Sequence, residues 1–213
     1  MTTLLLIRHG ESIANHERFF AGHFDADLHE NGLLQAKETA KFIAENYKVD
    51  KIYASDLKRA FKTAKALADL LDMDIIPDKN LREINAGKWD GRKFEDLLAE
   101  YKESYILWRT HIGFAACDGG ESVRQLADRA MAVFTKIAEE NDGKTVAVAT
   151  HATPIRAMQS LLQTGTLEQM ENIPWPTNAS VTVLRYDRGK WQLVAASLDD
   201  HLEGIKTGVY TKI

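Results

Sequence analysis

The chain has 213 residues, of which 45% are hydrophobic and 27% charged, and this composition predicts one globular domain over residues 1–213. Its net charge of −4 at pH 7 excludes a general attraction to nucleic acid or to an anionic membrane. The single cysteine, Cys117, excludes an internal disulfide and a thiolate-rich metal site. Because no stretch approaches the roughly 20 apolar residues that cross a bilayer, and no basic segment with an apolar run opens the chain, we expect a cytoplasmic protein.

Short apolar runs alternate along the chain with stretches in which apolar residues recur at helical spacing. In chain order, the predicted elements are a strand over 4–7, a helix over 33–47, a strand over 51–54, a helix over 57–71, a strand over 74–76, a short helix over 94–101, a helix over 121–138, a strand over 146–149, a helix over 154–165, and strands over 181–186 and 191–195. Ser55 stands at the N-cap position of the second helix. The glycine-containing stretch 110–120 is predicted to be a loop that covers a site.

The order of these elements predicts the fold class. Strands that alternate with helices are typical of an α/β protein with a mostly parallel sheet. The last two strands are joined by only four residues, 187–190, and this spacing predicts a closing hairpin. We therefore expect a three-layer α/β/α sandwich with an antiparallel edge.

Two of the predicted strands end in a histidine. The first strand runs into Arg8 and His9, and the strand over 146–149 runs into Thr150 and His151. Ligands of open α/β sheets bind at the carboxyl ends of the strands, so we expect both histidines at one site. Arg59, one turn into the helix over 57–71, is expected to point to the same edge.

Two imidazoles and two guanidiniums predict a pocket for a dianion such as phosphate. Arginine presents a planar fork that matches phosphate oxygens. A neutral imidazole can attack phosphorus when its other ring nitrogen is held by an acceptor, a role open to His9 or His151. The leaving oxygen then needs a proton from a carboxylic acid, and we assign this role to Glu83, which lies in the irregular segment 81–89.

These residues belong to a pattern that extends along nearly the whole chain. The run Arg8-His9-Gly10-Glu11-Ser12, with Asn15 three residues later, resembles the opening signature of the histidine phosphatase superfamily in its phosphoglycerate-mutase-like branch. The other matching segments, in the family's order, are Gly22 and Asp25, Ser55-Asp56-Leu57-Lys58-Arg59-Ala60 with Thr63-Ala64, Leu81-Arg82-Glu83-Ile84-Asn85-Ala86-Gly87, Gly120-Glu121-Ser122, and His151 with Arg156.

The resemblance implies a role for each candidate residue. His9 would accept the phosphoryl group and Glu83 would donate the proton. The transferring group would be held by Arg8, Arg59 and His151, with Asn15 as a further donor. The family needs no metal, and cationic side chains would supply the electrostatic stabilisation. We therefore expect no metal or cofactor, and a small phosphorylated metabolite as partner.

The sequence also favours one reaction within the family. Phosphoglycerate mutases usually carry Arg-His-Tyr-Gly directly after the acid, whereas Glu83 is followed by Ile84-Asn85-Ala86-Gly87. They also carry paired arginines near the lid, where this chain has Arg109 and then Thr110. We therefore expect a phosphomonoester hydrolase. A cofactor-dependent mutase and a phosphate-ester sensor without turnover remain the alternatives.

Other polar residues receive structural interpretations. Cys117 is interpreted as a loop residue. His16, His23 and His29 match no ordinary metal-ligand spacing and are interpreted as solvated. Arg156 is expected to pair with a carboxylate. The sequence does not determine whether the segment after Leu198, with Asp199, Asp200 and His201, reaches the rim of the pocket.

Overall fold

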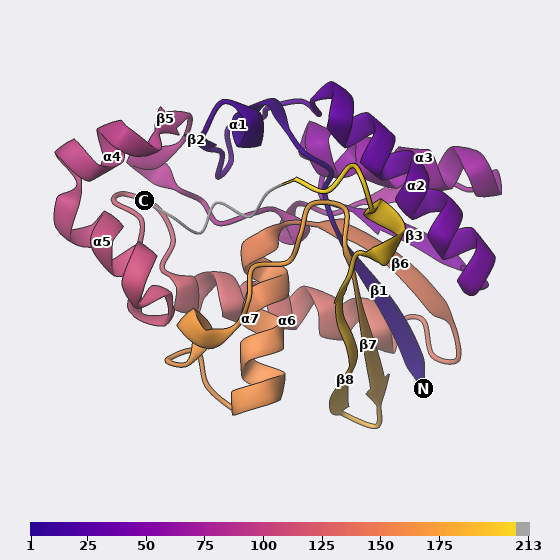
Figure 1. The fold of residues 1–213 in the computed structure, drawn as a ribbon. Coiled ribbons are helices and arrows are strands. Elements are labelled where there is room, and N and C mark those ends of the chain that lie inside the picture. Colours follow the sequence, from indigo (N-terminus) through magenta and orange to yellow (C-terminus); the bar gives the residue numbers. More distant parts are fainter. Residues whose placement is uncertain (208–213) are drawn as a thin grey trace.

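A six-stranded sheet forms the centre of the computed structural model, which describes residues 1–207 (Figure 1). Its strand order is β4-β3-β6-β1-β7-β8, and a separate small sheet pairs β2 with β5. The strands are β1 (Thr2–Arg8), β2 (Phe19–Phe20), β3 (Lys51–Ala54), β4 (Ile75–Pro77), β5 (Arg92–Lys93), β6 (Thr145–Thr150), β7 (Val181–Asp187) and β8 (Lys190–Leu198). The α-helices are α1 (Ile13–His16), α2 (Glu30–Asn46), α3 (Lys58–Leu71), α4 (Phe94–Glu100), α5 (Lys102–Thr110), α6 (Val123–Glu139) and α7 (Ala152–Thr164).

The directions of the strands confirm the predicted sheet. β1 pairs in parallel with β6, and β3 pairs in parallel with both β6 and β4. β7 lies antiparallel to β1, and β8 lies antiparallel to β7, so the predicted hairpin forms the antiparallel edge. The carboxyl ends of β1, β3 and β6 therefore meet at one edge of the sheet.

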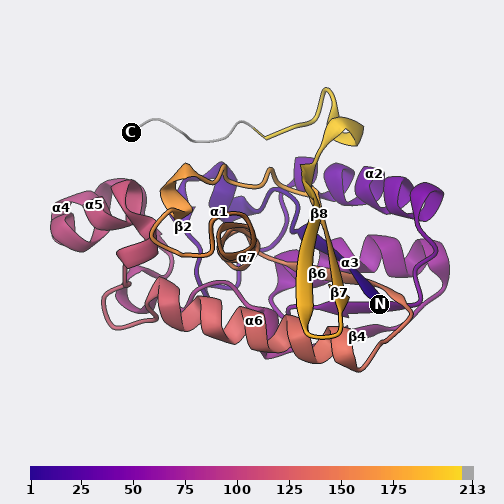
Figure 2. The same ribbon diagram turned by 90° about the horizontal axis from the view of Figure 1, so that it is seen from below.

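Helices cover both faces of the sheet, which confirms the predicted three-layer sandwich (Figure 2). Successive side chains of a strand point to opposite faces. Leu5 and Ile7 of β1 pack in the cluster that includes residues of α2 and α3, whereas Leu4 and Leu6 pack in the cluster that includes residues of α6 and α7. All four are at most 1% exposed, as is typical of a strand buried on both faces.

A third cluster of buried residues extends the molecule beyond the sheet, where Figure 1 shows α4 and α5. It contains Trp89, Tyr105 and Trp108. α5 was not predicted, because its buried residues Tyr105 and Trp108 are only three positions apart and give little periodic signal. This helix brings two aromatic side chains toward the carboxyl edge of the sheet.

The prediction for Ser55 is wrong. α3 begins at Lys58 and its N-cap residue is Leu57, whose side chain makes no cap; the main-chain N–H of Lys58 instead donates to the Asp25 carboxylate at 2.8 Å. α6, in contrast, begins at a capping box in which the Ser122 hydroxyl accepts from the main-chain N–H of Gln125 and the Gln125 side chain accepts in return. Among the described helices, none is long and apolar enough to cross a membrane.

Candidate active site

The ends of β1 and β6 bring the two predicted histidines together. Arg8 is in register with Thr150, and the main-chain N–H of His9 donates to the Thr150 carbonyl at 3.0 Å. The centroids of the His9 and His151 rings lie 5.1 Å apart, with the ring planes inclined by 62°. This juxtaposition follows from the parallel register of the two strands.

His9 is held in one orientation by its own loop. Its Nδ1 lies 2.7 Å from the Gly10 carbonyl, which can only accept, so Nδ1 carries the proton and Nε2 carries the free lone pair. Burial, together with the charges of Arg59 and Arg8, lowers the pKa of His9 well below its ordinary value. The imidazole is therefore neutral at pH 7, the state in which Nε2 is nucleophilic.

Two buried guanidiniums flank this imidazole. Arg8 donates to the Pro176 carbonyl at 2.5 Å, and Arg59 donates to the carbonyls of Phe24 and Gly22 at 2.9 and 2.7 Å. Burial lowers the pKa of each to about 10, so both remain charged at pH 7. Neither forms a salt bridge with a carboxylate of residues 1–207. The charge of Glu83 acts on both guanidiniums from a distance, but a buried positive charge without a salt bridge is costly, and an anion in the pocket offsets that cost.

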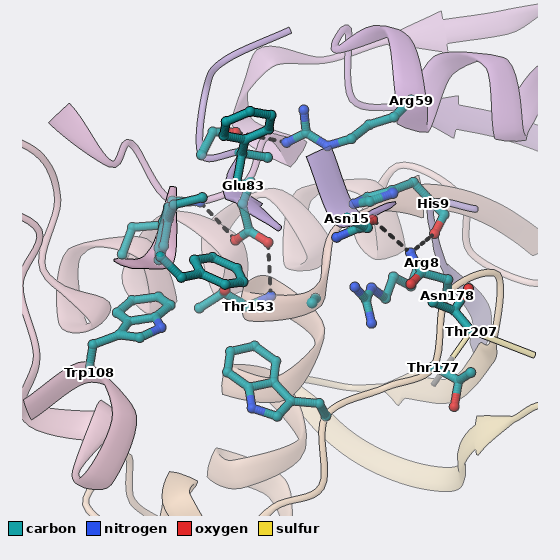
Figure 3. Close-up of a pocket in the computed structure, with 18 of the residues that line it drawn as sticks. Arg8, His9, Asn15, Arg59, Glu83, Trp108, Thr153, Thr177, Asn178 and Thr207 are labelled. Carbon is teal, nitrogen blue, oxygen red and sulfur yellow. Dashed lines mark hydrogen bonds between the residues drawn. The ribbon is translucent and has the colours of Figure 1, made fainter. Parts of the chain in front are cut away.

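The loop that holds Arg59 requires a glycine. Gly22 has a φ of +46°, and a Cβ built on it would lie 2.0 Å from Oδ1 of Asp90 and 2.5 Å from Cβ of Ala86. The close approach of this loop is what brings the Gly22 carbonyl within reach of the Arg59 guanidinium. The Arg59 guanidinium is thereby held at the cavity that it lines (Figure 3).

Two asparagines form the third side of the pocket. Oδ1 of Asn15 accepts from the Ser12 main-chain N–H, from the Ser12 hydroxyl and from Nδ2 of Asn178 at 3.0–3.2 Å. With its oxygen so occupied, the Asn15 amide presents its N–H groups as donors. Asn178 also donates to the His9 carbonyl at 3.0 Å (Figure 3). The sequence analysis missed Asn178, which lies between a helix and a strand with no motif around it.

Glu83 reaches the same cavity from the irregular segment between β4 and β5. Its carboxyl accepts from the main-chain N–H of Ile84 at 2.8 Å and from that of Thr153, at the start of α7, at 3.3 Å (Figure 3). The residue is 9% exposed. Arg129 of α6 fixes the segment by donating to the carbonyls of Arg82 and Glu83. A carboxyl group is therefore held in the cavity that His9 lines.

The structure places His151 behind His9 rather than in the cavity wall. It is 0% exposed, and its Nε2 lies 2.8 Å from the Ser55 hydroxyl. Its Nδ1 is buried without a hydrogen-bond partner among the described residues. Burial and the charge of Arg59 lower the pKa of His151 well below its ordinary value. The Ser55 hydroxyl, which was predicted to cap a helix, thus contacts His151, a candidate site residue.

A cavity of about 190 Å³ joins these polar groups to an apolar region. Its polar end is lined by Arg8, His9, Asn15, Arg59, Glu83 and Asn178. Its other end, which we call the aromatic wall, consists of Phe19, Phe20, Phe94, Tyr105, Trp108 and Trp175. The prediction that the loop 110–120 covers the site is wrong, because α4 and α5 supply the residues on that side.

Cys117, Arg156 and the segment after Leu198 differ in how they compare with the sequence analysis. Cys117 is buried, and burial raises the pKa of its thiol, so it remains protonated. Arg156 does not pair with a carboxylate as predicted; it donates to the carbonyls of Ile173 and Glu171, and its guanidinium lies 4.1 Å from the centroid of the Trp175 ring. His201 stacks on Phe42, whereas Asp199 accepts from the hydroxyl of the cavity residue Thr177, and Thr207 of the same segment lines the cavity (Figure 3). Asp200 has no recorded contact with the cavity residues, and residues 208–213 of the tail lie outside the described part.

His16 and His29 lie together despite their spacing in the sequence. Their donor atoms and a carboxylate oxygen of Glu11 fall within 4.8 Å of one another. The two rings, however, stack with centroids 4.0 Å apart and planes inclined by only 9°. An imidazole binds a metal through a lone pair in the ring plane, and two nearly parallel planes do not meet at one ion. In this conformation the cluster is a stacked pair beside a carboxylate.

Comparison with known proteins identifies the relatives of this chain. The model of the histidine phosphatase superfamily (branch 1) matches residues 4–199. Phosphoglycerate mutase-like protein 4 of Arabidopsis thaliana is 31% identical, with 94% of this chain and 86% of that protein covered. Phosphoserine phosphatase 1 of Hydrogenobacter thermophilus is 29% identical, with 95% of each covered. Among solved structures, Bacillus stearothermophilus YhfR has a TM-score of 0.90 at 27% identity, with 95% of this chain and 100% of that one covered.

Proposed function

We propose, from the premise that this chain belongs to the histidine phosphatase superfamily (branch 1), that it hydrolyses phosphate monoesters through a phosphohistidine on His9. One observation carries the proposal. A neutral, oriented imidazole lines a cavity together with two buried guanidiniums, neither of which has a carboxylate within salt-bridge distance among residues 1–207. Such a site combines a nucleophile with two fixed positive charges that bind the group to be attacked.

In the first half of the reaction, Nε2 of His9 attacks phosphorus and the bond from phosphorus to the ester oxygen breaks. The leaving oxygen takes the proton of the Glu83 carboxyl, so an alcohol departs and Glu83 becomes a carboxylate. In the second half, that carboxylate takes a proton from water as the water oxygen attacks phosphorus. The P–N bond breaks, inorganic phosphate forms, and both side chains return to their starting states.

The other site residues bind the phosphoryl group and position the nucleophile. The guanidiniums of Arg8 and Arg59 bind the phosphoryl oxygens, and the free N–H groups of Asn15 donate to the same oxygens. His151, buried edge-on against His9 and outside the cavity, positions the nucleophile and does not contact the phosphoryl group. Because the arginines are already charged, buried and fixed by main-chain carbonyls, they need no rearrangement when charge develops in the transition state. These side chains supply the stabilisation that a metal supplies in other phosphoryl-transfer enzymes.

A mutase is the second candidate, because one relative is named as mutase-like. A mutase must bind a small phosphorylated acid and return the phosphoryl group to it. Outside the polar end, which we now call the phosphate end, Arg109 is the one basic side chain among the described residues that line the cavity. The aromatic wall adds only the neutral donors of Tyr105, Trp108 and Trp175. This arrangement supports hydrolysis over transfer to a phosphorylated acid.

The experiment is phosphate release from a panel of monoesters, including 3-phosphoglycerate, in the presence of EDTA. The panel is run on the intact protein and on His9→Ala. The proposal predicts release that resists the chelator and disappears in His9→Ala. Full hydrolysis by His9→Ala would contradict the phosphohistidine. No release from any ester, combined with phosphorylation of His9 by a bisphosphorylated donor, would favour the mutase, whereas saturable ester binding without either product would favour a sensor.

A further inference from the structure

We propose that the aromatic wall selects phosphate monoesters whose leaving group is an uncharged, ring-bearing alcohol, and that Trp175 is its main specificity-determining residue. The inference rests on the proposed function, because it names the substrate class for that site. It goes beyond that function because it assigns a role to the aromatic part of the cavity, which the catalytic residues do not explain. Three observations carry it: the construction of the wall, the support of Trp175, and the distribution of charge.

The wall is a connected set of rings rather than scattered apolar side chains. Phe20 packs edge-to-face on Trp89 and on Trp108, with centroids 5.4 and 5.1 Å apart. Trp108 in turn lies 6.4 Å from Trp175, with their planes inclined by 34°. Phe20 and Trp108 are at most 8% exposed, so their orientations are set by packing. A rigid aromatic surface binds a ring with little loss of conformational freedom.

Trp175 is held from behind by Arg156. The guanidinium lies 4.1 Å from the centroid of the Trp175 ring, a contact in which a cation is attracted to an aromatic face. Arg156 is itself 5% exposed and fixed by the carbonyls of Ile173 and Glu171 at 2.7 and 3.3 Å. Trp175 belongs to an irregular segment, so this contact substitutes for the support of a helix or strand. Arg156 is therefore a positioning residue for the wall.

The charges near the wall disfavour an acidic leaving group. Arg109 is the one basic side chain of residues 1–207 that lines this end, and it is exposed to solvent. Glu83, which is protonated when the ester binds, lies between this end and the phosphate end and offers a second carboxylate no positive charge (Figure 3). A carboxylate moved from water against six aromatic side chains loses hydration and gains no buried positive charge in the wall, only the neutral donors of Tyr105, Trp108 and Trp175. An uncharged ring loses little hydration and gains contact area.

Three esters with primary alcohol leaving groups separate these effects: benzyl phosphate, ethyl phosphate and phosphoserine. We expect kcat/KM for benzyl phosphate to exceed that for each of the others by about tenfold or more, mainly through KM. In Trp175→Leu, benzyl phosphate should lose about tenfold in kcat/KM while ethyl phosphate changes by less than about twofold. Trp191→Leu, on the hairpin strand β8, is the matched control and should change neither ester.

The role of Arg156 has its own test. Arg156→Gln should raise KM for benzyl phosphate and leave kcat for ethyl phosphate unchanged, because the phosphate end is intact. Arg156→Lys, which keeps a positive charge behind the ring, should restore part of the affinity. If Arg156 only stabilised the fold, Arg156→Gln would lower kcat/KM equally for both esters, and Arg156→Lys would restore neither. Thermal unfolding of each variant identifies any that fails to fold, and Trp175→Phe then replaces Trp175→Leu.

Binding of phosphonates separates failure of this inference from failure of the proposed function. Benzylphosphonate and ethylphosphonate cannot be hydrolysed, and calorimetry should show about tenfold tighter binding of the benzyl compound, lost in Trp175→Leu. Tighter binding of benzylphosphonate without turnover of any ester would contradict the proposed function but support the role of the aromatic wall in selecting the ligand. Equal binding of the two phosphonates, or preference for phosphoserine over benzyl phosphate, would overturn the inference.

Discussion

The Ser55 hydroxyl lies 2.8 Å from Nε2 of His151, so the end of β3 holds the imidazole at the end of β6. The two strands are neighbours in the sheet, with Ala54 in register with Ala149. His151 in turn lies edge-on to His9. A chain of contacts across three adjacent strands therefore determines where the second imidazole sits behind the nucleophile.

Removing this hydroxyl should affect both stability and activity. Ser55→Ala leaves Nε2 of His151 buried without a partner, at a cost of about 1–3 kcal/mol in unfolding free energy. We also expect a lower kcat with little change in KM, because the ground-state contacts of the ester remain. Ser160→Ala is the matched control, since it removes a buried hydroxyl that donates to the Thr166 carbonyl outside the site. Equal activities in the two variants would contradict a positioning role for Ser55.

We expect Asn178 to be necessary for the correct positions of His9 and Asn15 at the phosphate end of the cavity. Its Nδ2 bridges the His9 carbonyl and Oδ1 of Asn15, so Asn178→Ala removes the one side chain that ties these two groups together, although each keeps other hydrogen bonds. Because a displacement of about 1 Å in a catalytic group can cost about 100-fold, we expect kcat/KM to fall by about 10- to 100-fold. Steady-state kinetics on benzyl phosphate tests this. Asn172→Ala, at an exposed asparagine bonded to Gln169, should leave the kinetics unchanged.

The acid role of Glu83 predicts a dependence on the leaving group. Glu83→Gln keeps the size of the side chain and removes the transferable proton. With ethyl phosphate, whose leaving oxygen needs that proton, kcat/KM should fall by about 10²–10⁴. With 4-nitrophenyl phosphate, whose leaving group departs as a stable anion, the loss should be much smaller. Equal losses for the two esters would show that Glu83 does not protonate the leaving oxygen.

The two buried histidines predict a fall of stability in mild acid. Burial lowers the pKa of His9 and of His151 well below the ordinary value, so below about pH 6.5 the unfolded chain binds protons that the folded chain does not. Stability is therefore retained above that pH and decreases below it, by about 1.4 kcal/mol per pH unit for each histidine. Urea unfolding at about pH 7.5, 6.5 and 5.5 measures this slope.

Histidine variants test which side chains cause this dependence of stability on pH. His9→Asn should flatten the dependence by about one histidine's share, whereas His111→Asn, at an exposed position, should not. His201, half-buried on Phe42, has a pKa that burial lowers as well, and it contributes to the slope that remains. A slope that is the same in the parent protein and in His9→Asn would contradict a neutral buried imidazole at this position.

Much of the fold and part of the site follow from local sequence. The run from Leu4 to Ile7 predicts a strand buried on both faces, and a histidine directly after each of two parallel strands predicts their meeting. What the sequence does not indicate depends on tertiary contacts between segments without periodicity. Asn178 and Trp175 come from the irregular stretch before β7, and only the folded chain brings them beside Asn15 and Trp108.

Ser55 and Arg156 show a related limit. A serine just before a helix is ordinarily its cap, yet the proximity of His151 gives the Ser55 hydroxyl another partner. A buried arginine ordinarily pairs with a carboxylate, yet main-chain carbonyls and the Trp175 ring satisfy Arg156. In both residues the type of side chain was informative about polarity, but the partner was determined by a distant segment.

The most direct test of the phosphohistidine is to trap it. The protein is mixed with a ³²P-labelled monoester in EDTA, quenched in alkali within the first turnovers, and digested, because phosphohistidine survives alkali that removes phosphoserine. The account predicts label on the peptide that contains His9, formed as fast as the alcohol is released and absent in His9→Ala. Release of phosphate with no labelled peptide, or with label on a peptide that lacks His9, would contradict it.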